Sequence, residues 1–148
     1  MNDKKWMAIA IEQAKRGLKL EEVPVGAVLV LNDKLVAKAH NQSIVNSDAT
    51  AHAEIQLLRK AGKKLGNYRL TDSTLYVTLE PCTMCFGAMI HARIERLVYG
   101  AYDPKTGVCG SCGNLTNADY LKHKIDITGG ILEKECSQIL KSFFKLRR

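Results

Sequence analysis

The stretch Thr74-Leu-Tyr-Val-Thr-Leu-Glu-Pro-Cys-Thr-Met-Cys85 decides how this chain folds. Its first six residues, 74–79, predict a strand. Pro81 suits the start of a helix, because proline lacks the N–H that the first helical turn leaves unpaired. We expect this helix to run from Cys82 to about Ala92. A strand therefore passes almost directly into a helix at this point.

Strands and helices alternate along the rest of the chain. Apolar residues at helical spacing indicate an N-terminal helix capped by Asn2 or Asp3. Further strands are expected at 25–31, 34–40, 96–99 and 125–128, helices at 50–62 and 132–146, and loops at 32–33 and 103–114. The alternation predicts an α/β fold, a three-layer α/β/α sandwich around a mixed sheet of about five strands. We expect one domain over residues 1–148.

Composition and charge limit the classes of function. Hydrophobic residues make up 46% of the chain, as in water-soluble globular proteins, and no apolar run is long enough for a signal peptide or a membrane span. The five cysteines are therefore expected to be metal ligands or reduced thiols of a cytoplasmic protein. The net charge of +7 favours a polyanionic partner, although a basic surface without a partner explains it equally well.

Two short segments carry residues of metal-site chemistry, His52-Ala-Glu54 and Pro81-Cys-Thr-Met-Cys85. One histidine and two thiolates are ligands that zinc prefers, and three protein ligands leave a fourth position open for water, as in catalytic sites. Cys82 and Cys85 are three residues apart, so both sulfurs lie on one face of their helix. The helix N-terminus favours thiolates there.

Glu54 lies two residues from the histidine, where a carboxylate can handle the protons of that water. Zinc lowers the pKa of a bound water to roughly 7. Taken alone, C-x-x-C is also typical of a redox dithiol or of half a structural zinc site, and H-x-E is common by chance. The two segments together favour a catalytic zinc held by His52, Cys82 and Cys85.

The pattern H-x-E…P-C-x-x-C resembles the signature of zinc-dependent nucleobase deaminases. Longer segments resemble bacterial tRNA-specific adenosine deaminases, and they are Glu22–Val28, Thr50–Ile55, Asn67–Leu70, Thr74–Cys82, Gly87–His91 and Phe143-Phe144. The resemblance implies a cytidine-deaminase-like fold, a homodimer and one Zn²⁺ per subunit. It also implies hydrolytic deamination of the wobble adenosine to inosine in the anticodon loop of an arginine tRNA, with Glu54 as the proton shuttle. Guanine and other free-base or nucleotide deaminases are the alternative.

The resemblance also implies roles for further residues. Asn41 matches an asparagine that hydrogen-bonds the flipped base, and Pro24 and Val25 match an apolar wall of the base pocket. Asp103 and Lys105 lie in a loop that is similar to the family's RNA-facing loop. Without the resemblance, Asn41 would be interpreted as a turn residue, Val25 as core, and the loop as solvated.

Basic residues cluster in two places near aromatic side chains. One cluster is Arg59, Lys60, Lys63, Lys64 and Arg69, near Tyr68, and the other is Lys141, Lys145, Arg147 and Arg148, near Phe143 and Phe144. Unpaired RNA bases can stack on aromatic side chains. We expect Phe143 to be core and Phe144, Arg147 and Arg148 to contact RNA. A zinc-stabilised RNA-binding module without activity would have no need of Glu54.

Two features remain outside this interpretation. Cys109 and Cys112 form a second C-x-x-C that departs from the family's pattern, and we interpret them as reduced thiols, because no further ligands have matching spacing. The remaining cysteine, Cys136, is expected in the core. The helix from Cys82 is apolar around more than one face, through Met84, Phe86, Met89 and Ile90, which predicts a two-fold symmetric homodimer.

Overall fold

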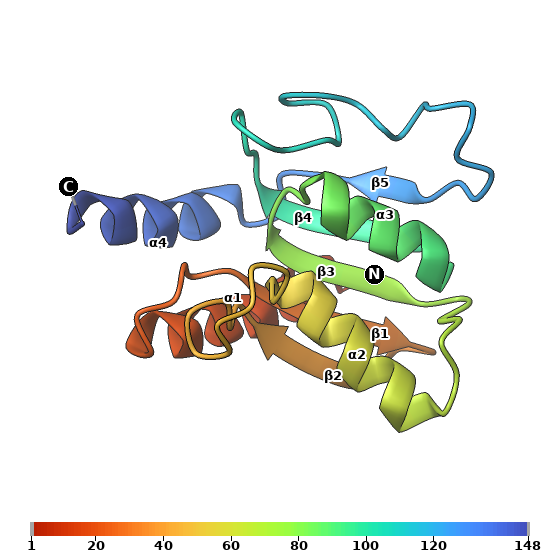
Figure 1. Cartoon of the computed structure of the whole chain (residues 1–148), viewed down its shortest axis with the longest axis horizontal. Coiled ribbons are helices and arrows are strands. Elements are labelled where there is room, and N and C mark those ends of the chain that lie inside the picture. The colour runs from red at the N-terminus through yellow and green to blue at the C-terminus, as the bar shows by residue number, and fades with distance from the viewer. Residues whose placement is uncertain (1, 148) are drawn as a thin grey trace.

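The structure is a computed structural model that describes residues 2–147 (Figure 1). Over that range it contains four helices and five strands. In chain order they are α1 (Asp3–Lys19), β1 (Gly26–Leu31), β2 (Lys34–His40), α2 (Ala53–Leu65), β3 (Thr74–Leu79), α3 (Thr83–Ala92), β4 (Arg96–Ala101), β5 (Asp126–Thr128) and α4 (Glu133–Lys145).

The strands form one mixed sheet in the order β2-β1-β3-β4-β5. β1 is antiparallel to β2 and to β3, whereas β3, β4 and β5 are parallel to one another. The parallel pair β3 and β4 is joined through α3, so the chain turns from strand to helix at the carboxyl end of β3. In open sheets with parallel strands, this edge is where functional residues gather.

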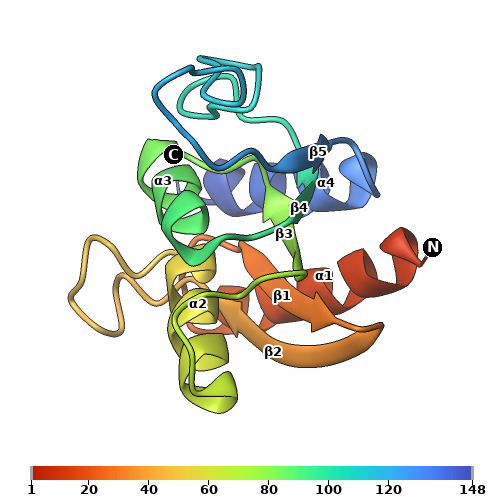
Figure 2. The ribbon, with the colours of Figure 1, turned by 90° about the vertical axis from the view of Figure 1, so that its right-hand side faces the viewer.

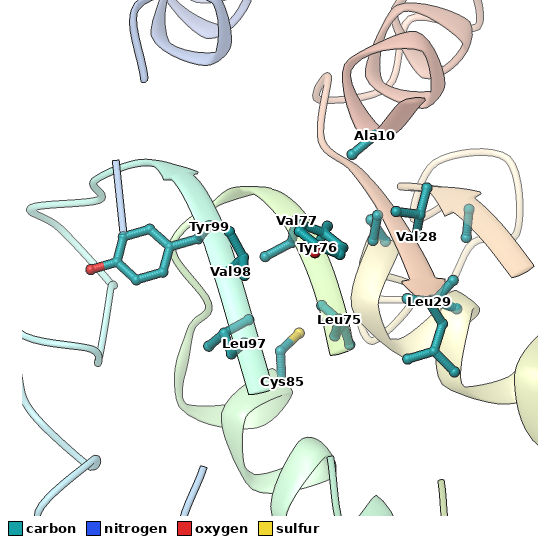
Figure 3. Packing of buried hydrophobic residues seen from close by; sticks show 14 of the residues in the cluster. Ala10, Val28, Leu29, Leu75, Tyr76, Val77, Cys85, Leu97, Val98 and Tyr99 are labelled. Carbon is teal, nitrogen blue, oxygen red and sulfur yellow. The ribbon is translucent and has the colours of Figure 1, made fainter. Parts of the chain in front are cut away.

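Helices cover both faces of the sheet, with α1 and α4 on one face and α2 and α3 on the other (Figure 2). This arrangement confirms the predicted three-layer sandwich. Figure 3 shows side chains of the central strands packed between the layers, among them Val28, Leu75, Val77, Leu97 and Val98. α1 approaches β1 so closely that a Cβ at Gly26 would lie 2.0 Å from the carbonyl oxygen of Ala10.

An ion pair and a hydrogen bond fasten the start of α1 to strands β3 and β4. Both oxygens of Asp3 accept hydrogen bonds of 2.8 Å from Arg96 on β4, and Tyr76 on β3 donates another of 2.8 Å to Asp3. Neither Asn2 nor Asp3 caps the helix through its side chain. Asn2 thus occupies the predicted N-cap position without a capping bond, and the carboxylate of Asp3 binds Arg96 instead.

Most predicted elements are confirmed with shifts at their ends. α2 begins at Ala53 rather than at residue 50 or 51, because the segment before it forms hydrogen-bonded turns and His52 is extended, with φ −67° and ψ 157°. It also runs beyond Gly62 and ends where Gly66 adopts a left-handed conformation, with φ 65°. α3 starts one residue later than expected, with Cys82 as its extended N-cap. Over residues 2–147, no helix combines the length and apolar character needed to cross a bilayer.

Candidate metal centre

The N-termini of α2 and α3 lie side by side and carry the motif residues (Figure 1). His52 is the N-cap of α2, and Cys82 is the N-cap of α3. Cys85 follows in the first turn of α3 and is buried. Both N-cap residues are extended, which turns the chain into the helix immediately after them. Residues thirty positions apart in sequence thus meet at one edge of the sheet.

The geometry of these three side chains fits a tetrahedral metal. His52 Nδ1 lies 3.7 Å from Cys82 Sγ and 3.5 Å from Cys85 Sγ, and all three ligand atoms lie within 4.8 Å of one another. Zn–N bonds of about 2.05 Å and Zn–S bonds of about 2.3 Å at a tetrahedral angle place nitrogen and sulfur about 3.6 Å apart. The donor set and its spacing therefore match a three-ligand zinc site.

Hydrogen bonding also prepares these groups to bind a cation. A hydrogen bond from the Cys85 thiol lowers the pKa of Cys82 to about 4, with a further contribution from His52. The same contact raises the pKa of Cys85. The hydrogen bond with Cys82 raises the pKa of His52. One thiolate is therefore present at neutral pH even before a metal binds.

Glu54 points into the same place from the first turn of α2 and is only 4% exposed. Burial raises the pKa of its carboxyl to about 7, against the opposing effect of its backbone hydrogen bond and of His52. A hydrogen bond also links it to Cys85. The structure thus places a buried carboxyl group with a pKa near neutrality against the three candidate ligands.

Asn41, Pro24 and Val25 lie together beside the metal centre. Asn41 Oδ1 accepts a hydrogen bond of 2.7 Å from the backbone N–H of Ala53, the first residue of α2. Its own N–H donates to the carbonyl of Val25 at 3.2 Å. Pro24 and Val25 are both buried. With Oδ1 used by the helix, the side-chain amide of Asn41 keeps two N–H donors for other partners.

Glu80 is a residue that the sequence-based reasoning missed. It is 2% exposed and organises the loop that follows β4. Oε1 accepts from the N–H of Asp103 at 3.1 Å, and Oε2 accepts from those of Cys109 at 2.8 Å and Ser111 at 3.2 Å. The Ser111 hydroxyl donates to Oε1 as well. The sequence feature that could have indicated Glu80 is its position between a buried strand and Pro81, because a carboxylate at such a buried position needs hydrogen-bond donors.

The predicted RNA-facing loop is held by its own first residue. The carboxylate of Asp103 accepts backbone hydrogen bonds from Lys105 at 3.0 Å and from Thr106 at 3.2 Å, and another from the Thr106 hydroxyl. Lys105 is exposed. The side chain of Asp103 is thus occupied in shaping the loop, whereas that of Lys105 points into solvent.

Cys109 and Cys112 do not form a second metal site in the range 2–147, where the group formed by His52, Cys82 and Cys85 is the only one found. Burial raises the pKa of Cys109 to about 12, helped by the nearby carboxylates of Glu80 and Glu54. All five cysteines are free. Cys109 is therefore a neutral thiol close to the candidate site.

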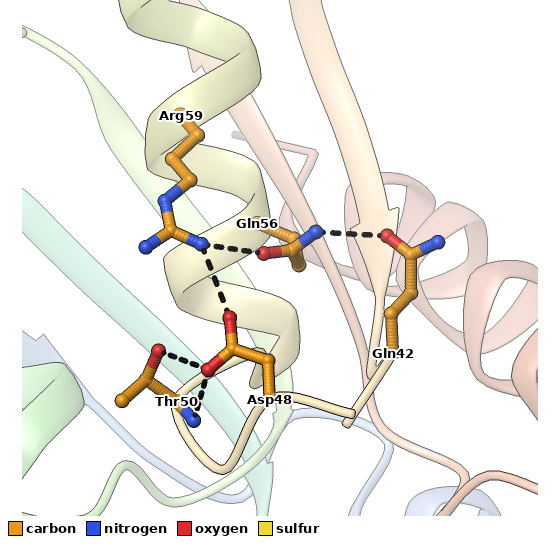
Figure 4. A network of polar contacts seen from close by, with 5 residues as sticks. All are labelled: Gln42, Asp48, Thr50, Gln56 and Arg59. Carbon is orange, nitrogen blue, oxygen red and sulfur yellow. Dashed lines mark hydrogen bonds and ion pairs between the residues drawn. The ribbon is translucent and has the colours of Figure 1, made fainter. Parts of the chain in front are cut away.

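A polar network fixes the segment that leads into α2 (Figure 4). Arg59 contacts Asp48 at 3.7 Å and donates to Gln56 Oε1 at 3.1 Å, and Gln56 Nε2 donates to Gln42 Oε1 at 2.9 Å. Asp48 also accepts from the backbone and hydroxyl of Thr50. Arg59, which the sequence placed in a basic cluster, is therefore partly engaged by Asp48 and Gln56.

Of the other basic residues in that cluster, Lys60 donates to the carbonyl of Lys38 on β2, whereas Lys63, Lys64 and Arg69 lie in or just beyond the C-terminal end of α2. Here a hollow of about 440 Å³ is lined by Tyr68, Arg69, His91, Arg93 and Lys122, among others. Tyr68 is 75% exposed, and the guanidinium of Arg69 lies 5.7 Å from its ring centre. The aromatic and basic character predicted for this region is present, but it is remote from the N-termini that carry the metal centre.

The C-terminal residues are divided between core and surface. Phe143 is buried, as expected, and Phe144 is 48% exposed. The guanidinium of Arg147 lies 3.7 Å from the Phe143 ring centre and donates to the Phe143 carbonyl at 3.3 Å. Arg148 lies outside the described residues. α4 extends from the side of the molecule where α2 and α3 begin (Figure 1).

Comparison with known proteins agrees with this geometry. A family of MafB19-like deaminases matches residues 1–148. A tRNA-specific adenosine deaminase of Haemophilus influenzae is 52% identical over 147 residues, covering 99% of this chain and 85% of that protein. One of Bacillus subtilis is 44% identical over 143 residues, covering 97% and 89%. The chain belongs to this deaminase family.

A solved structure of the family has the same fold. It comes from biochemical and structural studies of A-to-I editing by tRNA:A34 deaminases at the wobble position of transfer RNA. The two chains share 42% identity and superpose with a TM-score of 0.87, over 92% of this chain and 99% of the other. The predicted resemblance to bacterial tRNA-specific adenosine deaminases is thereby confirmed.

Proposed function

We propose that this chain is a zinc-dependent tRNA adenosine deaminase that converts the wobble adenosine of an arginine tRNA to inosine. The observation that carries the proposal is the meeting of His52, Cys82 and Cys85 around one point with the buried carboxylate of Glu54 beside them. Membership in a family of tRNA-specific adenosine deaminases supports the substrate class.

His52, Cys82 and Cys85 would hold the zinc, which supplies a water whose pKa is lowered to roughly 7. Glu54 would accept a proton from the attacking water and deliver it to N1 of the adenine ring. It would then transfer the second proton to the amino group at C6, which leaves as ammonia. One buried carboxyl with a pKa of about 7 can both accept and donate these protons near neutrality.

The neighbouring residues would bind and orient the base. Asn41 would donate a hydrogen bond from its free side-chain amide to an acceptor on the purine edge, because its oxygen is fixed by Ala53. Pro24 and Val25 would form the apolar wall of the pocket. Lys105, together with Phe144, Arg147 and Arg148 beyond the last strand, would contact the anticodon stem-loop, whereas Asp103 would shape its loop.

We also propose a homodimer and a cytoplasmic location. The dimer argument changes in one respect, since Phe86 and Met89 are buried within the chain and cannot form an outward surface. Met84 and Ile90, both half-buried, are the residues of α3 left to contact a second copy. Five free cysteines accord with a reducing compartment.

The decisive experiment mixes the purified protein with an arginine tRNA and sequences the product for inosine at the wobble position. Guanine and free adenosine, assayed in parallel, test the alternative of a free-base or nucleoside deaminase. Inosine in the tRNA with no ammonia from either small molecule supports the proposal. Ammonia from guanine without inosine in tRNA would replace it with the alternative.

Metal content is tested separately by elemental analysis. The wild type should contain one zinc per chain, and the Cys82→Ser/Cys85→Ser double variant should contain almost none. Cys109→Ser/Cys112→Ser is the matched control, because it removes the other C-x-x-C and should keep the zinc. Zinc retained by the first variant and lost by the second would reverse the assignment.

A further inference from the structure

A buried carboxylate outside the metal centre holds the tip of a surface loop. Glu22 is 1% exposed, and nothing in the proposed chemistry uses it. Its Oε1 accepts from the N–H of Ile44 at 3.1 Å, and Oε2 accepts from the N–H of Val45 at 2.8 Å. Burying an ionised carboxylate is costly unless hydrogen bonds compensate, so this contact fixes the backbone of the loop strongly.

The loop that Glu22 holds presents two aliphatic side chains to solvent. Ile44 is 64% exposed and Val45 is 55% exposed. They are adjacent, and the turn around them is closed by further backbone hydrogen bonds, from Asn46 to Gln42 at 2.9 Å and from Asp48 to Ser43 at 2.9 Å. The hydrogen-bonded backbone thus holds two adjacent exposed aliphatic side chains in a fixed place beside the candidate site.

The apolar pair lies next to the metal centre along the chain and in space. The loop starts directly after Asn41 and ends at His52, and its two ends are joined by a hydrogen bond of 2.9 Å from the N–H of Gln42 to the carbonyl of Ala51. It projects from the body between β2 and α2 (Figure 2). A substrate seated between Asn41 and Glu54 therefore has this projection at its side.

We propose that Ile44 and Val45 form an apolar contact for the unpaired nucleotide adjacent to the reacting adenosine, and that Glu22 is the positioning residue that holds them there. The inference rests on the proposed function. An RNA base acted on by a deaminase must leave its stack, and its neighbour then exposes a base face and ribose that need cover. Aliphatic side chains provide such cover without reading sequence.

The test uses an anticodon stem-loop RNA and a second RNA in which the flanking nucleotide lacks its base. Ile44→Ser/Val45→Ser should raise KM for the intact RNA by roughly tenfold, since it removes two aliphatic side chains that the bound RNA would cover. The value of kcat at saturating RNA should change less than twofold. Leu35→Ser, at the far end of β2 and 37% exposed, is the matched control and should leave KM unchanged.

The two RNAs and two proteins form a double-mutant cycle. Removing the flanking base should weaken binding by the wild type but not by Ile44→Ser/Val45→Ser, because the contact is already lost. If removing the base and changing the protein weaken binding independently, so that their two effects add, the proposal is wrong. Glu22→Gln should raise KM as Ile44→Ser/Val45→Ser (the surface variant) does. Combining the two should raise KM little further. Should Glu22→Gln not fold, the surface variant alone decides.

Other outcomes separate the remaining explanations. If Ile44→Ser/Val45→Ser instead shifts sedimentation from dimer to monomer, the pair contacts a second copy and the nucleotide proposal is wrong. If the wild type leaves the intact stem-loop unchanged while it deaminates guanine, the proposed function itself fails. A normal wild-type rate with an unchanged KM in the surface variant refutes only the apolar contact.

Discussion

Replacing Glu80 by glutamine should loosen the loop at residues 103–111. The favoured orientation of the new amide keeps its oxygen at the position of Oε2, where it continues to accept from Cys109 and Ser111. Its NH₂ group then stands where Oε1 accepted from the N–H of Asp103, so that N–H loses its acceptor. The Ser111 hydroxyl can rotate to accept from the amide.

The cost follows from these contacts. An N–H left without an acceptor in a buried place costs about 1–3 kcal/mol, and hydrogen bonds to a neutral acceptor are about 1 kcal/mol weaker each than those to a charged one. The sum is about 3–5 kcal/mol. For a chain of this length, that corresponds to a fall in Tm of roughly 10 °C if the loop is part of the cooperative unit.

Thermal unfolding measures a loss of global stability, and amide hydrogen exchange measures local opening of the loop. If the loop opens by itself, protection at Cys109 and Ser111 should fall by about 100-fold or more, while α1 stays protected. Glu12→Gln, the same change at an exposed position of α1, is the control. A Glu80→Gln variant that matches Glu12→Gln in both Tm and loop exchange would refute the reasoning.

Three further outcomes are expected. Glu54→Gln should keep zinc and RNA affinity but lower kcat by about 100- to 10,000-fold, measured as inosine formed per enzyme. Near-normal turnover would assign proton transfer to another residue. The hydrogen bond with Arg96 lowers the pKa of Asp3 below 3.8, so Asp3→Asn should lower the free energy of unfolding at neutral pH by about 1–2 kcal/mol, as measured by urea titration. This difference should vanish as the pH falls through the lowered pKa, because the carboxylate is then protonated in the wild type as well. A difference that persists in acid would exclude the ion pair as its cause. Arg147→Ala should flatten the slope of log affinity against log salt by roughly 0.7, with an unchanged slope indicating no phosphate contact.

Local patterns were sufficient to predict that the three candidate metal ligands lie together, and to predict most of the fold. His52, Cys82 and Cys85 could be brought together from the sequence because all three lie at helix starts, His52 and Cys82 as N-caps and Cys85 in the first turn of α3, so that short segments determine both their chemistry and their placement. The start of α2 was misplaced, since the turns before Ala53 are stabilised by side chains that lie elsewhere in sequence.

The parts that could not be predicted depend on long-range partners. Glu22 and Glu80 look like ordinary charged residues in sequence, yet each is buried because a loop more than twenty residues away supplies backbone donors. Asp3 similarly pairs with Arg96, 93 positions along the chain. No local periodicity signals such pairs, because the choice of partner is made by the packing of the whole sheet and its helices.

The distribution of the free thiols would let chemical labelling report both on the proposed zinc and on unfolding. Cys112 is exposed and should be alkylated at once by a thiol reagent, whereas Cys136 packs so tightly that a Cβ at Gly100 would lie 2.4 Å from its sulfur. With the proposed zinc bound, Cys82 and Cys85 should become reactive only when that zinc leaves, and Cys136 only when α4 separates from β4. Mass spectrometry of a labelling time course would therefore distinguish release of the proposed zinc from global unfolding in a single sample of the wild-type protein.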